Sequence, residues 1–563
     1  MSENSNGAPS LNPPTRPRSL LVIDGQMLKE LAEASLTWLK TNQQTVNSLN
    51  VFPVPDGDTG TNMVLTMQAA WDEIANSPEH NVGKIAHAIA HGALMGARGN
   101  SGVILSQLWR GFARALDTHE LLDASGLVHA FAIGRDTAYK GVVRPVEGTI
   151  LTVAKDAAAA CETAASQTND LVEMLSLIVP AMDDSVQSTP GLLPVLREAG
   201  VVDAGGKGLF FIVEGMLRHL QGLPIDSPLT TVQPLAALNL ENTLESIEPG
   251  QDYEVVVDFR PSGALNLESF YNTLEEMGTS IQVGEGEGIY RMHIHVPTEK
   301  RYEPIDYTMS LGTITKVAIE NLMVQMEDIQ RRAGKTKLTL APVEPGQIAV
   351  VAVAPGPGIA RVFASLGVSA IVEGGQTMNP STQEIINAFE NLPTDHVIIL
   401  PNNKNIILAA QTAMQLTVKK IAVVPSRTVP QGLAAMLRLA PDGNLEKVAA
   451  EMTAALDEVL TGEITIATRS VEMDGVQVKE GQVIALLDGK LVLSSSDLED
   501  AVLHLLDFAH AERFELVTLF FGADLPRREV DHIADLIRTR FPEQEIEVQD
   551  GGQPHYSFIL SIE

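Results

Sequence analysis

Two aspartates one residue apart, Asp56 and Asp58, stand in a segment over 50–63 and are followed at once by Thr-Gly-Thr-Asn. Carboxylate and amide oxygens are the ligands that Mg²⁺ prefers, and a few suffice when phosphate oxygens fill the remaining positions. Gly57 between the acids allows the turn that lets both carboxylates converge. The helical pattern that begins near Thr61 would offer free N–H groups to an anion. The segment therefore predicts a cation and phosphate site.

An Asp-Gly-Asp sequence is also common in ordinary polar turns and at the start of calcium loops. The calcium loop of an EF-hand is excluded, because the alternating acids and the terminal Glu that it needs do not follow. A surface turn remains the alternative. The apolar approach over 51–55 and the helical patterns on both sides favour the site.

Two further small-residue motifs follow this segment. The first, Gly-Ala-Arg-Gly-Asn-Ser-Gly at 96–102, lies between helical patterns over about 82–95 and 103–116. Such a turn can present backbone N–H groups to an anion, although many interhelical turns are simply glycine-rich. The second covers 201–208, where Asp203 is placed to cap the next helix. Together with the acidic segment, these motifs predict a phosphate site.

The composition limits the partners. The 563 residues include 39 Lys and Arg against 71 Asp and Glu, a formal charge of −32, which disfavours nucleic acids and anionic membranes. The single cysteine, Cys161, excludes an intrachain disulfide and fits a reducing compartment. The most apolar window, 348–372, is interrupted by prolines, glycines and an arginine, so no membrane span is expected. Residues 1–19 have no apolar core of a secretory signal, so we expect a cytoplasmic protein.

Helical periodicity dominates the first part of the chain. Residues 1–22 read as a disordered tail, and 23–221 as an all-α domain in which strand signals are almost absent. Besides the helices flanking the motifs, patterns over about 26–47, 121–139, 148–166 and 169–187 predict helices. The Ser-Thr-Pro-Gly sequence at 188–191 predicts a further helix start, since proline favours the first helical turn.

The three motifs resemble the nucleotide-binding domain of the dihydroxyacetone kinase family. The sequence over 47–55, ahead of the acids, is similar to that of the ATP-binding subunit of bacterial fatty-acid kinase. The resemblance implies a barrel of eight antiparallel helices that binds ATP and two Mg²⁺ ions. It implies that Asp56 and Asp58 are metal ligands, with Asn50 the third.

The motifs and the resemblance together predict the nucleotide contacts. Residues at the helix starts would hold the phosphates, while Thr149 and Asp203 would shape the nucleotide pocket. The predicted nucleotide-binding residues are Thr59, Gly60, Thr61, Asn62, Gly99, Asn100, Ser101, Thr149 and Asp203.

After a linker over 222–250, an α+β middle domain is expected over 251–334, with strands near 252–260, 279–283 and 290–296 and a closing helix from about 315 to 332. His293 and His295 share one strand face, a start for a zinc site. The resembled kinase subunit has a cysteine on the first strand, where this chain has Glu254. A pair of histidines without metal stays an equal alternative.

The remaining chain reads as two α/β lobes, over 345–450 and 460–563. In the first lobe, short apolar runs alternate with helical patterns, which predicts a parallel sheet. Polar loops at its carboxyl edge predict a surface that recognises ligands or partners, and well-capped turns are the alternative. The Gly-Gly-Gln-Thr-Met-Asn-Pro-Ser-Thr loop at 374–382 is also similar to the kinase subunit. The second lobe reads as scaffold and interface.

The motifs and the resemblance together predict a catalytic subunit that binds ATP and Mg²⁺, and the resemblance implies that it phosphorylates a carboxylate. The resemblance implies the acceptor: a fatty acid presented by a separate binding protein of the DegV family, giving an acyl phosphate. The alternatives are a kinase subunit of the dihydroxyacetone type and a non-catalytic nucleotide-binding scaffold. A homodimer is expected, without nucleic acid or integral membrane association.

Overall fold

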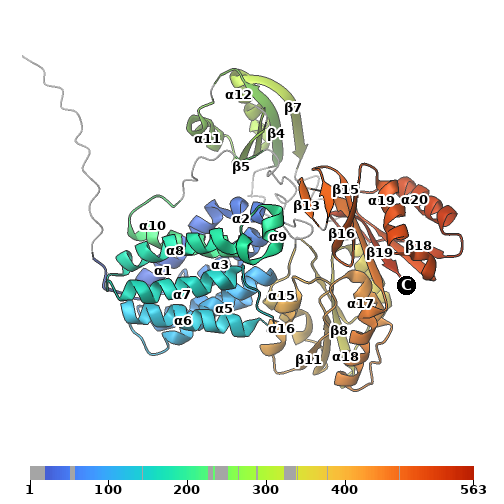
Figure 1. Ribbon diagram of the computed structural model, residues 1–563, viewed down its shortest axis with the longest axis horizontal. Coiled ribbons are helices and arrows are strands. Elements are labelled where there is room, and N and C mark those ends of the chain that lie inside the picture. Colours follow the sequence, from blue (N-terminus) through green and yellow to red (C-terminus); the bar gives the residue numbers. More distant parts are fainter. Residues whose placement is uncertain are drawn as a thin grey trace, which may run out of the picture.

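The computed structural model describes residues 19–50, 57–142, 144–225, 233–234, 252–263, 265–286, 289–321, 338, 340–376, 378–467, 470–473 and 475–563. A helical N-terminal region lies beside a two-lobed α/β C-terminal region, and a small sheet domain lies at the top of the view in Figure 1. Among the described residues, no helix combines the length and the apolar character needed to cross a membrane.

The N-terminal region is helical, as predicted. Its helices are α1 (Gly25–Thr41), α2 (Gln43–Leu49), α3 (Thr59–Ile74), α4 (Val82–Met95), α5 (Gly99–Ala115), α6 (Ala124–Gly141), α7 (Ile150–Ala165), α8 (Leu171–Leu192), α9 (Pro194–Ala199) and α10 (Ala204–Leu220). Successive long helices pack side by side, and α1 also packs against α10. One short antiparallel pair, β1 (Val22–Ile23) with β2 (Leu122–Asp123), was not expected from the sequence.

Side-chain caps define where these helices begin. Asp24 accepts from the N–H of Met27 at the start of α1, and Asn81 accepts from the N–H of Lys84 at the start of α4. Such caps satisfy N–H groups that have no partner within the helix. Because long helices joined by short connections alternate in direction, α3, α5, α7 and α10 all begin at the same end of the region.

The predicted helix start at 188–191 is wrong. Helix α8 runs on to Leu192 with Pro180 and Pro190 inside it. The hydroxyls of Ser188 and Thr189 donate to carbonyls within α8 and so do not cap a new helix. Pro190 stands near the helix end and removes only one backbone hydrogen bond, which the buried face of α8 can offset.

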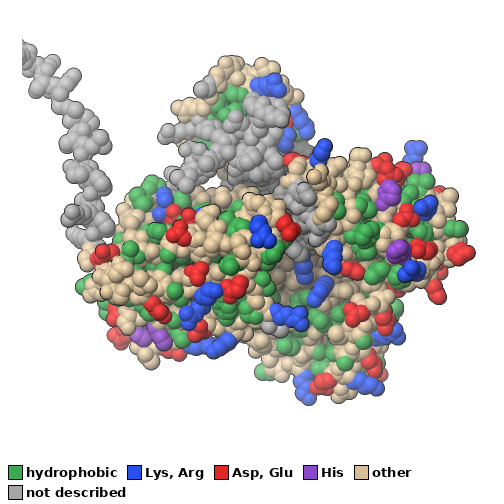
Figure 2. All heavy atoms as spheres, viewed as in Figure 1, with side chains coloured by type: hydrophobic (Ala, Val, Ile, Leu, Met, Phe, Trp, Pro, Cys, Tyr) green, Lys and Arg blue, Asp and Glu red, His purple; other side chains and the backbone are tan. Residues whose placement is uncertain are grey.

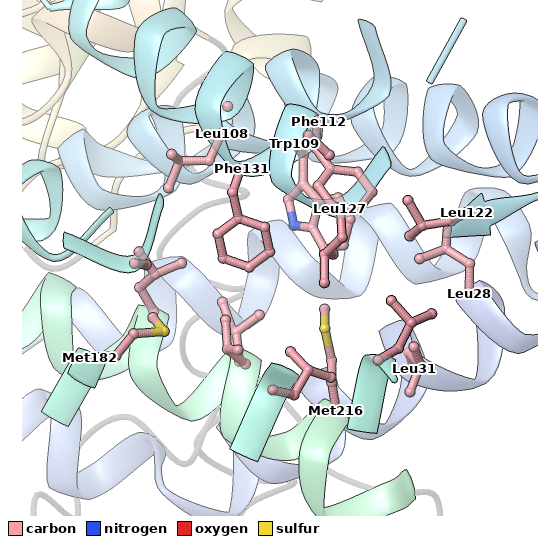
Figure 3. A pocket seen from close by; sticks show the side chains of 18 of the residues that line it. Leu28, Leu31, Leu108, Trp109, Phe112, Leu122, Leu127, Phe131, Met182 and Met216 are labelled. Atoms are coloured by element: carbon pink, nitrogen blue, oxygen red, sulfur yellow. The ribbon is translucent and has the colours of Figure 1, made fainter. Parts of the chain in front are cut away.

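The interior of the helical region contains a cavity of about 110 Å³. Its wall is almost wholly apolar and includes Trp109, Phe131, Met182 and Met216, which point into it from several helices (Figure 3). Such a wall offers nothing that could pair with a triphosphate. The cavity is therefore not the predicted nucleotide site.

In its described residues, the middle domain is a sheet with two helices. Its elements are β4 (Tyr253–Pro261), α11 (Leu267–Glu275), β5 (Thr279–Gly286), β6 (Ile289–Val296), the 3₁₀ turn Thr298–Lys300, α12 (Glu303–Leu311) and β7 (Gly312–Asn321). The strand order is β3-β5-β6-β4-β7, where β3 (Gln233–Pro234) pairs parallel to β5.

The predicted helix over 315–332 is wrong for its first part. Residues up to Asn321 belong to β7, which pairs antiparallel with β4. Thr315, Val317 and Ile319 are β-branched, and β4 gives them a partner strand, so pairing outweighs the helical pattern. Residues 322–332 lie outside the described residues.

The first C-terminal lobe confirms the predicted parallel sheet. Its strands are β8 (Ile348–Ala354), β9 (Ala370–Glu373), β10 (His396–Leu400) and β11 (Lys420–Val423), in the order β11-β10-β8-β9. Every pairing between them is parallel. Its helices are α14 (Pro357–Ser365), α15 (Thr382–Glu390), α16 (Ile407–Gln415), α17 (Val429–Met436) and α18 (Leu445–Ala454), followed by the 3₁₀ turn Ala455–Asp457.

The second C-terminal lobe contains a mixed sheet in the order β16-β15-β12-β19-β17-β18. Its strands are β12 (Leu460–Ile466), β15 (Val483–Leu487), β16 (Lys490–Ser495), β17 (Leu516–Phe521), β18 (Glu545–Asp550) and β19 (Tyr556–Ile562). Helices α19 (Leu498–Phe508) and α20 (Arg527–Arg540), the 3₁₀ turn Ala511–Arg513 and the small hairpin of β13 (Val471–Met473) and β14 (Val476–Val478) complete the lobe.

Candidate functional site

Asp58 is a buried carboxylate at the start of α3. Only 6% of the residue is exposed. Burial raises its pKa to about 6, while hydrogen bonds from the side chains of Asn62 and Asn379 act in the opposite direction. Asn379 Nδ2 lies 2.5 Å from Asp58 Oδ2. A buried acid of this kind is stabilised in its charged form by a cation, which agrees with a metal-binding role.

Helix α2 fixes the start of α3. The hydroxyl of Thr61 accepts from Gln43 Nε2 at 2.9 Å and from Asn47 Nδ2 at 3.1 Å, and the Thr61 N–H donates to Asn47 Oδ1 at 3.1 Å. A Cβ on Gly60 would collide with the carbonyl of Gln43, so glycine permits this close packing. Gly57, at φ +58°, makes the turn before Asp58. Gln43 and Asn47 were not predicted as site residues, although Asn47 opens the stretch over 47–55 that resembles the kinase subunit and Gln43 lies one helical turn before it.

The second motif opens α5 directly. The helix expected from residue 103 begins at Gly99, so the N–H groups of Asn100 and Ser101 belong to its first turn. Gly99 has a φ of +56°, and a Cβ there would lie 2.7 Å from Asn62 Nδ2. Glycine is therefore required for α5 to approach α3 this closely.

Asp203 joins the starts of two other helices. Its carboxylate accepts from the N–H of Gly206, at 2.6 Å, at the start of α10. It also accepts from the N–H of Ile150 at the start of α7, and burial raises its pKa to about 6. Ser101 Oγ would lie 3.5 Å from a Cβ on Gly205. The starts of α5, α7 and α10 therefore converge, and Gly99 adds that of α3.

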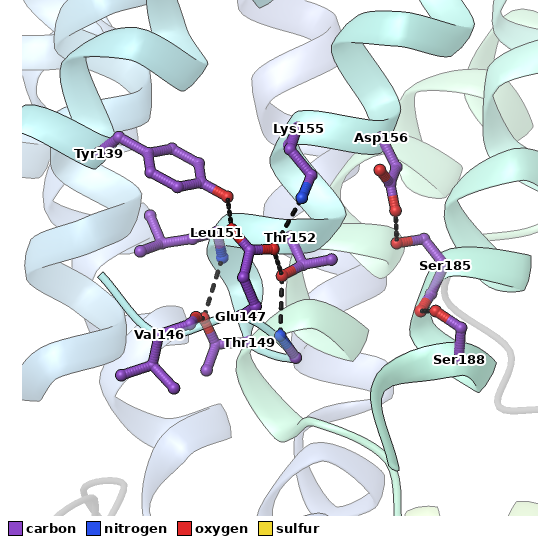
Figure 4. A network of polar contacts seen from close by, with 11 residues as sticks. Tyr139, Val146, Glu147, Thr149, Leu151, Thr152, Lys155, Asp156, Ser185 and Ser188 are labelled. Carbon is purple, nitrogen blue, oxygen red and sulfur yellow. Dashed lines mark hydrogen bonds and ion pairs between the residues drawn. The ribbon is translucent and has the colours of Figure 1, made fainter. Parts of the chain in front are cut away.

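The loop before α7 is held by a polar network (Figure 4). Thr149 caps α7 through its hydroxyl. Glu147 accepts from Tyr139 Oη at 3.0 Å, from Thr152 Oγ1 at 2.7 Å and from Lys155 Nζ at 2.7 Å. The bond from Lys155 is the main cause that lowers the pKa of Glu147. This network keeps Thr149 at the same end of the region as Asp203.

Loops of the first C-terminal lobe cover this end. Arg98 donates through Nη1 to the carbonyl of Asn379 at 2.9 Å and pairs with Glu384 at 3.2 Å. The N–H of Thr382 donates to the carbonyl of Ala97 at 3.2 Å. The predicted recognition edge thus contacts another part of the same chain. On the face drawn in Figure 2, several Lys and Arg side chains lie along the boundary between the helical region and the C-terminal lobes.

The predicted residues fall into three groups. Asp58, Asn62, Gly99, Ser101 and Asp203 lie at the converging helix starts, as given above. Thr59, Gly60 and Thr61 lie in the first turn of α3, Asn100 lies in the first turn of α5, Thr149 caps α7, and Asn50 follows α2 as its C-cap. Asp56 lies outside the described residues.

The middle domain brings Glu254, His293 and His295 together. One ligand atom from each lies within 4.8 Å of the others. Both histidines are buried, and His293 Nε2 is 2.8 Å from Glu254 Oε1. The three side chains lie close together because β4 and β6 pair in an antiparallel register that sets Glu254 opposite His295. Two imidazoles and a carboxylate are a donor set that fits zinc.

A small polar cleft between the two C-terminal lobes was missed in the sequence. Its volume is about 40 Å³, and its lining includes Asn403, Arg427, Glu463 and His555. Burial raises the pKa of Glu463 to about 7. Glu463 stands inside the apolar strand β12, where nothing in the sequence around it indicates a site.

Comparisons with known proteins identify the family of the chain. Three family models match: the DAK2 domain over residues 53–218, the middle domain of FakA-like fatty acid kinase proteins over 249–329, and the C-terminal domain of the same FakA-like proteins over 349–563. An uncharacterized protein of Staphylococcus aureus strain USA300 is 37% identical over 549 residues, which is 96% of this chain and 99% of that protein.

Some solved structures match part of the chain at low TM-scores. The DegV family protein Cg2579 from Corynebacterium glutamicum has a TM-score of 0.31 at 17% identity, over 38% of this chain and 96% of that one. DegV, a fatty acid binding protein from Bacillus subtilis, has a TM-score of 0.31 at 12% identity, over 38% of this chain and 98% of that one. The family matches and the full-length relative show that the chain belongs to the FakA-like family of fatty acid kinase proteins.

Proposed function

We propose that the chain is the ATP-binding catalytic subunit of a fatty-acid kinase. It transfers the γ-phosphate of ATP to the carboxylate of a fatty acid held by a separate DegV-family protein, and the product is an acyl phosphate. The observation that supports this most is the buried carboxylate of Asp58 where helix starts converge. Phosphoryl transfer needs little more from a protein than positioning and neutralised charge.

The residues of the site fit Mg²⁺ and a nucleotide. Asp58, together with Asp56 and Asn50, would supply the hard oxygen ligands that Mg²⁺ prefers. When bound, Mg²⁺ neutralises phosphate charge. The N–H groups at the starts of α3 and α5 would face the phosphates, because helix N-termini favour anions. Thr59, Gly60, Thr61, Asn62, Gly99, Asn100 and Ser101 would form this cradle, and Thr149 and Asp203 the pocket beside it.

Several wider properties belong to the same proposal. The packing of successive helices, and of α1 on α10, supports a closed barrel of eight helices. The domain limits, a cytoplasmic location and a homodimer stay as predicted from the sequence. Water must be kept away from an acyl phosphate, a mixed anhydride that hydrolyses readily. The cover from the C-terminal lobe and a docked acceptor protein would serve this purpose.

A phosphate-transfer assay tests the proposal. The full chain, ATP and Mg²⁺ are combined with a fatty-acid-loaded DegV-family protein, and acyl phosphate is trapped with hydroxylamine. We expect product only when chain and loaded partner are both present, and none with Asp58→Ala. Phosphorylation of dihydroxyacetone in place of the fatty acid would favour the ketone kinase alternative. Nucleotide binding with no transfer to either acceptor would favour the scaffold.

We also propose that Glu254, His293 and His295 hold a zinc ion with a structural role. The support is their donor chemistry and the burial of both imidazoles. A metal would link the side chains of β4 and β6, in addition to the backbone hydrogen bonds that pair the two strands. Metal analysis of the purified chain tests this directly.

A further inference from the structure

Asn379 lies on the loop between β9 and α15, yet it reaches the helical region. It is 2% exposed, and its Nδ2 donates to Asp58 Oδ2 at 2.5 Å. Its other amide atom, Oδ1, is buried and accepts no hydrogen bond from any residue that the structure describes. An acceptor buried without a donor is costly, and such groups are rare without a reason.

Several contacts hold Asn379 and the residues that follow it. Its carbonyl accepts from Arg98, whose guanidinium also pairs with Glu384. Ser381 and Glu384 form a reciprocal capping box at the start of α15. The side chain of Asn379 is thus placed by a capped helix and by an ion pair between the two regions. A group held in this way can act as a preorganised ligand.

The chemistry of the amide fits the charge beside it. Its N–H binds the carboxylate that would hold a cation, and its carbonyl oxygen is itself a hard ligand of the kind that Mg²⁺ and Mn²⁺ accept. The oxygen is part of the same amide group, so it is close to the same carboxylate. Asn379 Nδ2 would also lie 3.6 Å from a Cβ on Gly99, so the amide is next to the start of α5.

We propose that Asn379 belongs to the cation and nucleotide site, where its amide nitrogen orients Asp58 and its amide oxygen binds the cation or a water of the cation. The inference rests on the proposed function. The nucleotide site is then composite: the helical region provides the acid and the helix starts, and the C-terminal lobe provides a further ligand. The site is complete only while the lobe is docked.

The affinity of the full chain for Mn²⁺ tests this inference. It is measured at saturating ADP, with the concentration of free Mn²⁺ determined by electron paramagnetic resonance. Asn379→Leu removes both amide atoms at similar volume, and we expect at least about tenfold weaker Mn²⁺ binding. Asn379→Asp keeps an oxygen ligand but loses the N–H that orients Asp58, so its Mn²⁺ affinity should lie between those of the wild type and Asn379→Leu. Gln383→Ala, which changes a partly exposed side chain that bonds to Asn387 within α15, is the matched control and should behave as the wild type.

The outcomes separate the inference from the proposed function. If Asn379→Leu binds Mn²⁺ as tightly as the wild type, the inference alone is overturned. The inference alone is also overturned if the variant binds Mn²⁺ more tightly, because that is the result expected when a residue that blocks the site is removed. Equal weakening in the Leu and Asp variants would overturn the ligand role of the oxygen. Absence of Mn²⁺ and ADP binding in the wild type would remove the proposed function together with the inference. Thermal unfolding that matches the Gln383→Ala control shows that each variant is folded.

Discussion

The two candidate metal sites of this chain are assembled in opposite ways. Glu254 and His295 face each other across paired strands, so the middle domain makes its site alone. Asp58 and Asn379 are 321 residues apart and meet only because the C-terminal lobe docks on the helical region. The first site depends on strand register, and the second on contact between domains. A change at the domain boundary should therefore affect the second site and leave the first intact.

The largest expected effect is the loss of zinc from the candidate site of the middle domain. His293→Ala removes one of two buried imidazoles, and we expect bound zinc to fall to background because two remaining ligands hold the ion poorly. Atomic emission on the dialysed chain measures this. His532→Ala, which changes an exposed histidine in the second lobe, is the control. Nucleotide binding should not change in either variant; a loss in His293→Ala would show that the two sites are coupled.

The next effect concerns Asp58. Asp58→Ala should weaken Mg²⁺-dependent ATP binding at least about a hundredfold, since it removes a proposed metal ligand, while zinc content stays at the wild-type level. Calorimetric titration of ATP with and without Mg²⁺ measures the loss. An affinity equal to that of the wild type would remove Asp58 from the metal site.

The pH dependence of the stability of α3 gives a further test of the candidate site at Asp58. Burial raises the pKa of Asp58 from 3.8 to about 6, so the folded state holds this proton more tightly than the unfolded state. The free energy of unfolding therefore falls as pH rises from about 4 to about 6, by roughly 2–3 kcal/mol. Asp58→Asn lacks this fall. Hydrogen exchange at the amides of α3, recorded without metal, gives the local free energy of unfolding of the wild type and of Asp58→Asn at each pH. Parallel pH profiles of this free energy in the two proteins would contradict the prediction.

The smallest effects concern the contact between the regions. Arg98→Ala loses the bond to the Asn379 carbonyl and the ion pair with Glu384, and we expect ATP affinity to fall about threefold to tenfold. Glu384→Gln keeps the capping box and removes only the charge, so about twofold is expected. Calorimetry measures both, with exposed Arg197→Ala as control. Zinc loss in Arg98→Ala would contradict the independence of the two sites.

Sequence patterns were sufficient wherever the deciding contacts are local. The apolar runs of β8 and β10 indicated the parallel sheet, and a period of two placed His293 and His295 on one face. The glycine and aspartate motifs identified Gly99 and Asp203 before any geometry was available, although the resemblance to a kinase family was needed to connect them.

Sequence patterns failed where distant contacts decide. Strand β7 owes its conformation to pairing with β4, and α8 continues past the position where Pro190 suggested a new helix. Asn379 stood in a loop that read as a capped turn or a recognition surface. Only the docking of two domains, which no local pattern encodes, brings it to Asp58.

The convergence of helix starts has one more consequence. The chain carries a formal charge of −32, and yet it is proposed to attract a polyanion. Besides the bound cation, part of the attraction would come from aligned peptide dipoles, which neither titrate nor depend on one mobile ammonium group. Lysine acetylation or moderate ionic strength should then change nucleotide affinity little, because fixed, partly buried dipoles are screened less than surface charges.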